Sequence, residues 1–409
     1  MMRRAFLSVF LLLAVSPANS APKISGLWDA VVVVNKADIP FRFEIEQRGS
    51  QVQGFFFEGD RKVGSTSGSF EDGTLKLEYD FLNTTLEATL DGDALHGTYR
   101  NNRPNAKPME FRAQRFAPVP AGELHPPQIA GDWDMHRTAQ DNSKLDVSWR
   151  LYLRQSGSEV SGAILKTSGD TGDLTGRWKD GKLTMSHFAG ERPLLFEAQL
   201  NSDGTLAITL DRQFTYKAAR TTEAREKGIA EPPDPSRFTS VKDPTEGFHF
   251  SGPDLDGKIV DDSDPEFRGK VVLLVIGGSW CPNCHDEAVE LENLYKEFHG
   301  RGLEIVGLNF EMESDPAQAM PRVHSFIKRY GITFPMLVPG TPDQVSAKMP
   351  QLVNFGVYPT RIFLGRDGLV RSVHAGYASV ATGAEHVRLE HDERDLVTQL
   401  LAEKSKVNP

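Results

Sequence analysis

The chain has 409 residues and is acidic, with 46 Lys and Arg against 56 Asp and Glu, so its formal net charge at pH 7 is −10. This balance disfavours nucleic acid and anionic membrane surfaces as partners, because both require a basic surface. The length suggests two or three domains, and a count of 2 cysteines excludes a scaffold held together by many disulfides.

Residues 1–20 have the pattern of a signal peptide. Arg3 and Arg4 precede an apolar run, and small residues stand before Ala21. The apolar run is too short to span a bilayer, and no cysteine near the cleavage site is available for a lipid anchor. We therefore expect the mature chain to be exported, soluble, without a transmembrane segment, and periplasmic or otherwise extracytoplasmic. Cleavage removes two arginines and no acids, so the mature chain is more acidic still.

The first half of the chain contains an internal duplication. The segment Ile24–Asp29 returns as Ile129–Asp134, and Gly68–Leu77 (GSFEDGTLKL) returns as Gly176–Met185 (GRWKDGKLTM). Short alternating stretches with Asp-Gly turns predict antiparallel strands in each copy. We expect two β-rich repeats, residues 21–116 and 129–220, each a meander of about six to eight strands that is closed or nearly closed. Two lipocalin-like barrels and one joint sandwich remain open alternatives.

Two segments read as linkers. Prolines are concentrated in residues 117–128 and again in residues 221–246, and a short helix is expected over residues 221–227. Residues 247–409 then predict an α/β domain. Its expected strands are residues 271–276, 303–310, 360–364 and 369–375, and its expected helices are residues 284–299, 321–330, 343–353 and 391–404.

Cys281 and Cys284 form a CxxC motif that opens a helix directly after a buried strand. The amide groups and dipole at a helix N-terminus favour an anion, so the thiolate of Cys281 should be stabilised. Cys284 lies one turn further on, close enough to form a disulfide. Pro282 suits the first helical turn. We expect Cys281 to be the attacking cysteine, reachable from solvent, and Cys284 to resolve the mixed disulfide from a shielded position.

Two structural roles for the motif are less well supported. A zinc site needs about four ligands. The sequence offers the two cysteines and the adjacent His285, and its other histidines are scattered along the chain. A disulfide across two intervening residues closes almost no loop, so it would add little stability. We expect no metal and no cofactor.

From about Gly247 onward the chain resembles the TlpA/ResA branch of the thioredoxin superfamily, which overlaps with the redoxins. The resemblance rests on residues 250–258 (FSGPDLDGK), 268–274 (RGKVVLL), 277–287 (GGSWCPNCHDE) and 355–364 (FGVYPTRIFL). It implies a thioredoxin-like fold after the β repeats. It further implies that Pro359 is the cis-proline opposite the disulfide and, with Tyr358, binds substrate backbone.

The resemblance also assigns supporting roles around the cysteines. Glu287 matches an acidic residue that tunes their titration, and Trp280, Pro282 and Asn283 complete the motif. The dipeptide between the cysteines differs from the Gly-Pro of thioredoxin. In this superfamily the dipeptide helps to set the reduction potential of the cysteine pair. The buried aspartate of thioredoxin is replaced by Val275.

We therefore expect an exported thiol-disulfide oxidoreductase that reduces disulfides in exported proteins and is itself reduced by a membrane or extracytoplasmic thiol-disulfide donor. One alternative is a thiol peroxidase, although such enzymes carry a hydroxyl residue where this chain has Gly278. The other is a redox-gated binding protein whose β repeats capture a ligand or envelope partner.

Overall fold

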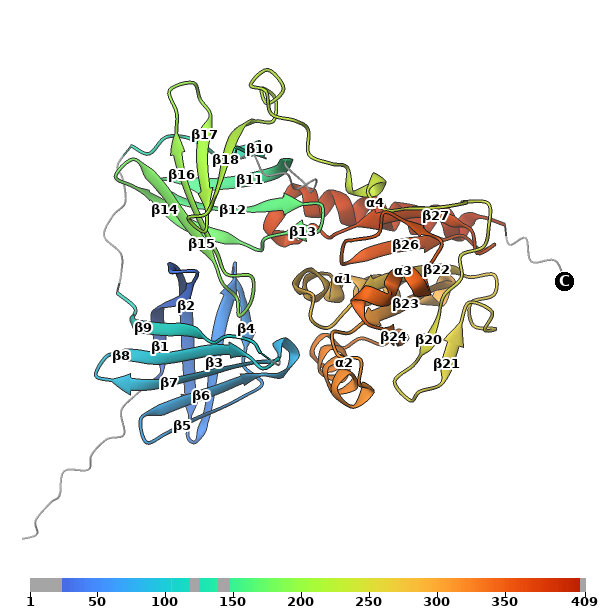
Figure 1. The fold of residues 1–409 in the computed structure, drawn as a ribbon, viewed down its shortest axis with the longest axis horizontal. Coiled ribbons are helices and arrows are strands. Elements are labelled where there is room, and N and C mark those ends of the chain that lie inside the picture. Colours follow the sequence, from blue (N-terminus) through green and yellow to red (C-terminus); the bar gives the residue numbers. More distant parts are fainter. Residues whose placement is uncertain (1–23, 104, 118–124, 139–147, 405–409) are drawn as a thin grey trace, which may run out of the picture.

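The computed structural model describes residues 24–103, 105–117, 125–138 and 148–404. The expected signal peptide, residues 1–20, lies outside the described residues, as does most of the first expected linker. The described chain forms two β units, stacked at the left of Figure 1, and an α/β unit at the right.

The first β unit is one sheet of nine antiparallel strands in the order β4-β3-β2-β1-β9-β8-β7-β6-β5. It is nearly closed, because β5 comes close to β3: a Cβ at Gly68 would lie 2.5 Å from the Val52 carbonyl. A 3₁₀ turn, η1, covers residues 80–82. The strands are β1 (Gly26–Val34), β2 (Ala37–Arg48), β3 (Gln51–Glu58), β4 (Arg61–Gly64), β5 (Ser67–Glu71), β6 (Thr74–Tyr79), β7 (Thr84–Asp91), β8 (Ala94–Asn101) and β9 (Met109–Arg115).

The second β unit repeats this plan and closes fully, because β11 pairs with both β10 and β12. Each unit has more strands than the six to eight expected, since β4 and β13 are too short for alternation to reveal them. Two separate sheets form, and not one joint sandwich. The strands are β10 (Gly131–Arg137), β11 (Ser148–Ser156), β12 (Glu159–Lys166), β13 (Gly169–Asp170), β14 (Leu174–Lys179), β15 (Lys182–His187), β16 (Leu194–Leu200), β17 (Leu206–Leu210) and β18 (Phe214–Arg220).

Equivalent residues stabilise the two β units. Trp28 and Trp133 are buried in the two cores, and their indole NH groups donate to the carbonyls of Ile24 and Ile129. The Asp-Gly turns before β6 and β15 have positive φ at both residues, as tight hairpins require. The duplication seen in the sequence is therefore a duplication of structure.

The loop between β15 and β16 joins the two β units. Phe188 belongs to the core of the first unit and packs against Phe41, Phe56 and Tyr99 with ring centroids 4.8 to 5.3 Å apart. The Tyr99 hydroxyl donates to the Gly190 carbonyl at 2.8 Å. This apolar contact fixes the β15–β16 loop, and with it Arg192, against the first unit.

The α/β unit is a five-stranded sheet in the order β24-β23-β22-β26-β27, in which β22, β23 and β24 are parallel, β26 is antiparallel to β22, and β27 is antiparallel to β26. Apolar clusters line both faces of the sheet. Its strands and helices are β22 (Val271–Gly277), α1 (Pro282–Phe298), β23 (Leu303–Phe310), α2 (Pro316–Tyr330), β24 (Met336–Gly340), α3 (Val345–Lys348), β26 (Thr360–Leu364), β27 (Val370–Ala375) and α4 (Ala384–Ala402).

Short elements complete the α/β unit. β20 pairs with β21, and β19, within the expected second linker, pairs with β25. Residues 221–228 form turns and not the short helix expected there. Where a helix was expected over residues 343–353, α3 has only four residues, with η4 before it and β25 after it. The short elements are η2 (Pro235–Arg237), β19 (Ser240–Val241), β20 (Ser251–Pro253), β21 (Ile259–Asp261), η3 (His299–Arg301), η4 (Pro342–Gln344), β25 (Leu352–Val353) and η5 (Val380–Thr382).

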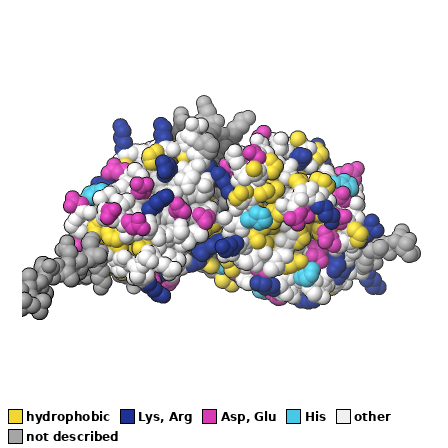
Figure 2. Space-filling view, turned by 90° about the horizontal axis from the view of Figure 1, so that it is seen from below, with side chains coloured by type: hydrophobic (Ala, Val, Ile, Leu, Met, Phe, Trp, Pro, Cys, Tyr) yellow, Lys and Arg dark blue, Asp and Glu magenta, His cyan; other side chains and the backbone are white. Residues whose placement is uncertain are grey.

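The α/β unit packs against both β units. The guanidinium of Arg329, at the end of α2, lies 4.7 Å from the ring centroid of Phe81 in η1. Figure 2, a view from below, shows hydrophobic side chains over much of the right-hand part of the molecule and basic side chains near its boundary with the left-hand part.

Candidate redox site

The two cysteines lie just after β22, at the start of α1. They form a disulfide with Cα atoms 5.2 Å apart. Cys281 is the N-cap of α1, and its Sγ accepts the amide of Cys284 at 3.3 Å. Pro282 occupies the first turn as expected. A sulfur in this position faces the amides of a helix N-terminus, an environment that favours a thiolate once the disulfide is reduced.

The residues before the motif are fixed by close contacts. The Trp280 indole donates to the Phe310 carbonyl at 2.7 Å, and a Cβ at position 278 would lie 2.3 Å from the same indole nitrogen. Ser279 donates from its amide and hydroxyl to Glu311, at 2.7 and 2.6 Å. Burial raises the pKa of Glu311. Gly278 is therefore required by packing, and Glu311 anchors the turn that presents Cys281.

Both cysteines are buried, with exposures of 3% for Cys281 and 4% for Cys284. We expected Cys281 to be reachable from solvent, and this expectation is wrong for the structure described. The β repeats contact the dipeptide between the cysteines, and no local sequence pattern predicts that contact.

Glu287 lies one helical turn after Cys284 in a buried ionic cluster. Its Oε2 is 3.6 Å from Nε of Arg361, which also pairs with Glu393. Burial raises the pKa of Glu287 to about 8, while Arg361 opposes the shift. A cavity of about 20 Å³ is lined by Cys284, Glu287, Asn309 and otherwise glycines and apolar side chains. It has room for one water molecule.

The expected proline loop lies beside the motif. The Tyr358-Pro359 peptide bond is cis, as the resemblance implied. Thr360 pairs with Ile276, so Pro359 comes opposite the end of the strand that leads into the motif. The rings of Tyr358 and Trp280 have centroids 5.1 Å apart. The fold therefore brings Trp280, Tyr358 and Pro359 together where β22 ends and β26 begins.

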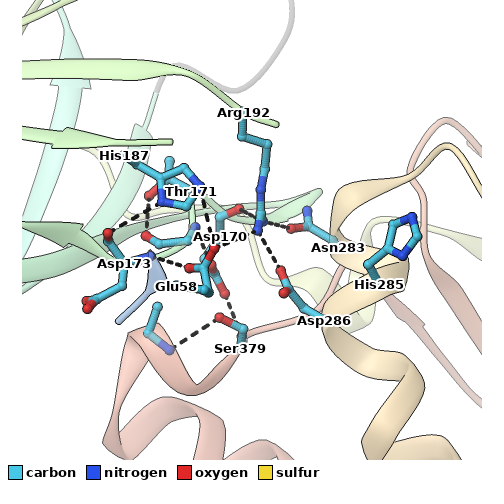
Figure 3. Close-up of polar contacts among 12 residues, drawn as sticks. Glu58, Asp170, Thr171, Asp173, His187, Arg192, Asn283, His285, Asp286 and Ser379 are labelled. Carbon is cyan, nitrogen blue, oxygen red and sulfur yellow. Dashed lines mark hydrogen bonds and ion pairs between the residues drawn. The ribbon is translucent and has the colours of Figure 1, made fainter. Parts of the chain in front are cut away.

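Residues of all three units meet at the start of α1 (Figure 3). Arg192 donates to Oδ1 of Asn283 at 2.7 Å and pairs with Asp286 at 2.8 Å. Glu58, in β3, is 3.7 Å from Arg192. Arg61 pairs with the other oxygen of Asp286 at 3.2 Å. Asn283 was expected as part of the motif.

The rest of this junction was not predicted. Arg61, Arg192 and Asp286 come from distant parts of the chain, and only the three-dimensional structure brings them together. Burial raises the pKa of Glu58, with Arg192 opposing the shift. Burial also raises the pKa of Asp173 to about 6 and lowers that of His187 to about 3.

Among the described residues, no group of three or more His, Cys, Asp or Glu is placed to hold a metal ion. None of the helices in that part of the chain is long and apolar enough to cross a membrane.

Comparisons with known proteins agree with this geometry. A family model described as the AhpC/TSA family matches residues 243–373. The thiol-disulfide oxidoreductase ResA of Bacillus subtilis (strain 168) is 28% identical over 158 residues, which cover 39% of this chain and 77% of that protein. ResA of Halalkalibacterium halodurans is 29% identical over 133 residues, 32% of this chain and 67% of that protein.

A solved structure of a thioredoxin-family thiol:disulfide interchange protein from Chlorobium tepidum TLS is 24% identical. The match covers 40% of this chain and 100% of the chain in that structure, with a TM-score of 0.31. The α/β unit, with its CxxC at the start of α1, is a ResA/TlpA-like member of the thioredoxin superfamily and places this chain among the thiol-disulfide oxidoreductases.

Proposed function

We propose that this protein is an exported reductase of disulfides in other exported proteins. The observation that carries the proposal is the position of Cys281, which caps α1, accepts the Cys284 amide and is bonded to Cys284. The signal-peptide pattern of residues 1–20 supports export. A dithiol donor at the membrane or outside the cytoplasm would return the protein to its reduced form.

In the reduced protein, the Cys281 thiolate attacks one sulfur of the partner's disulfide. That bond breaks, a mixed disulfide forms, and the departing partner sulfur takes up a proton. Cys284 then loses its proton and attacks Sγ of Cys281, which releases the second partner thiol. The partner gains two electrons and two protons, and the Cys281–Cys284 disulfide is formed.

We assign Glu287 to the proton movement at Cys284. Its pKa of about 8 allows the carboxyl to exchange a proton near neutral pH, and it shares the small cavity with Cys284. Acid-base groups work best when their pKa is near the working pH. Arg361 and Glu393 hold Glu287 in place and act as positioning residues.

We assign substrate binding to Tyr358 and Pro359, beside Trp280. The resemblance to the family and the position of Pro359 opposite the end of β22 support this assignment. Pro282 and Asn283 separate the two cysteines, so they influence the reduction potential of the pair.

A thiol peroxidase is less well supported. Position 278, three residues before Cys281, is glycine, and a Cβ there would lie 2.8 Å from the Phe310 carbonyl. The backbone packing therefore leaves no space for a hydroxyl side chain that could bind a peroxide oxygen.

The reductase proposal is tested by the reduction potential of the Cys281–Cys284 pair, measured by equilibration with thiol buffers. A midpoint near that of thioredoxin, about −270 mV, is expected. A midpoint above about −180 mV would make the protein an oxidase or isomerase. The Cys281→Ser variant should lose reduction of a model protein disulfide and serves as the control for turnover.

A further inference from the structure

The dipeptide between the cysteines is held by the second β unit. The Asn283 side-chain amide donates from Nδ2 to the Ser168 carbonyl at 2.7 Å, and its Oδ1 accepts from Arg192 at 2.7 Å. Both polar ends of this side chain are therefore engaged by one β unit. The second β unit therefore contacts the residue between the two cysteines, and both cysteines are buried in this arrangement.

The turn Lys166–Asp170, which runs from the last residue of β12 through β13, makes this contact through its backbone. The Asp170 amide donates to the Tyr377 carbonyl at 3.3 Å. Gly169 has a φ of +111°, and a Cβ there would lie 2.3 Å from Nδ2 of Asn283 and 2.8 Å from the Tyr377 carbonyl. At Gly376 a Cβ would lie 2.2 Å from the Thr167 carbonyl. Two glycines thus permit the close approach.

The loop beneath this turn is connected to the substrate-binding residues. Gly376 follows β27, and its amide donates to the Pro359 carbonyl at 2.7 Å. The turn Lys166–Asp170 therefore rests on Asn283 on one side and on the neighbour of Pro359 on the other. These are the two borders of the surface assigned above to a disulfide partner.

A buried ionic cluster holds the turn in position (Figure 3). The Arg192 guanidinium lies between Asp286 of α1, Glu58 of the first β unit and the Asp170 carbonyl, which it reaches at 3.3 Å. The Asp170 carboxylate accepts the amides of Gly172 and Ser379. Contacts between domains that are polar in this way resemble those of transient complexes.

The two sides of this contact differ in how firmly they are joined. Phe188 inserts into the core of the first β unit, so the two β units are coupled by apolar packing. Their contacts with the start of α1, in contrast, are mostly polar and are made by Arg61, Arg192 and the backbone of the turn, with a ring contact between Phe81 and His285 at 6.3 Å. A cleft of about 660 Å³ borders Lys166, Thr167 and Tyr377, so the turn has space beside it.

We propose that the turn Lys166–Asp170 is an intramolecular occupant of the surface to which a disulfide partner binds, and that Arg192 keeps it there. A partner reaches Cys281 only after the β units have moved away from the start of α1. The β repeats thus regulate access to the redox site. This inference rests on the proposed function, because it takes the partner to be a protein disulfide.

The test compares the rate at which two reductants reduce the Cys281–Cys284 disulfide in the full chain, namely dithiothreitol and a thioredoxin protein. In the Arg192→Gln and Gly169→Ala variants, reduction by the protein should be at least tenfold faster than in the wild type, with a smaller change for dithiothreitol. Gly157→Ala is the control for strain at a positive φ, because nothing lies within 4 Å of its Cβ position. Arg212→Gln is the control for loss of an exposed arginine in the same β unit.

A second measurement needs no variant of the turn. A cysteine peptide is trapped on Cys281 in the Cys284→Ser variant, and hydrogen exchange at the Asp170 amide is compared with that of the uncoupled chain. Protection at this amide should fall at least tenfold. Unchanged protection, or equal rates of protein reduction in the wild type and both variants, would overturn the proposal. Failure of the reduced chain to exchange with any disulfide would instead refute the proposed function.

Discussion

Replacement of Glu287 by glutamine tests the electrostatics of the site. Glu287 is buried, and burial raises the pKa of its carboxyl from 4.5 to about 8 in the oxidised protein. In the unfolded chain the carboxyl regains an ordinary pKa, so the folded state binds more protons between these two values. Stability should therefore be greatest below pH 4.5 as far as this group is concerned, and should be lost as the pH rises through 8.

The size of this effect follows from the two pKa values. One pKa unit corresponds to about 1.4 kcal/mol, so ionisation of Glu287 lowers the free energy of unfolding by about 5 kcal/mol well above pH 8. Glutamine cannot ionise. The free energy of unfolding of Glu287→Gln, minus that of the wild type, should therefore rise by about 4 kcal/mol between pH 5 and pH 9.

Urea unfolding of the oxidised proteins over this pH range measures the difference directly. Glu297→Gln is the matched control, because Glu297 lies on the same helix, is half exposed and pairs with Arg394 at 3.2 Å. A surface pair of this kind contributes about 0 to 1 kcal/mol, so its difference from the wild type should stay nearly flat. A change below about 1 kcal/mol for Glu287→Gln would show that the folded protein does not raise the pKa of Glu287.

Three further predictions concern the β repeats, and urea unfolding followed by fluorescence checks each. Trp133→Ala should lower the free energy of unfolding of the second β unit by about 3 to 5 kcal/mol, because the indole fills its core; a loss below 1 kcal/mol would contradict that role. Gly176→Ala should cost about 1 to 3 kcal/mol, since its Cβ would lie 1.9 Å from the Thr184 carbonyl, whereas Gly247→Ala, with no atom within 4 Å, should be nearly neutral. Phe188→Ala should cost about 3 to 5 kcal/mol, while the more exposed Phe214→Ala should cost much less; equal losses would show that Phe188 does not join the two units.

Much of the α/β unit could be predicted from local pattern. β22 is a continuous apolar run followed by glycine, and α1 begins at a cysteine-proline pair and carries an apolar stripe. These features depend on neighbours in the sequence, so the position of the CxxC motif followed from them. The helix ends were less accurate, since α2 begins at Pro316 and α4 at Ala384, both several residues before the expected starts.

The rest of the site depends on contacts between distant segments. Arg192 lies in a loop whose position is set by Phe188, which packs in the core of the other β unit. No periodic pattern in the sequence predicts this packing. The role of Arg361 could have been suspected from a charged residue inside an otherwise apolar strand, next to Pro359 and Thr360.

Cys281 should be the more acidic of the two thiols, because it caps α1. The ultraviolet absorbance of the thiolate, followed against pH in the reduced Cys284→Ser and Cys281→Ser variants, measures each thiol separately and does not depend on access by a reagent. The pKa of Cys281 should lie clearly below the ordinary value of about 8.5, and that of Cys284 at or above it. Two thiols that both titrate at about 8.5 or higher would show that the N-terminus of α1 does not stabilise the Cys281 thiolate.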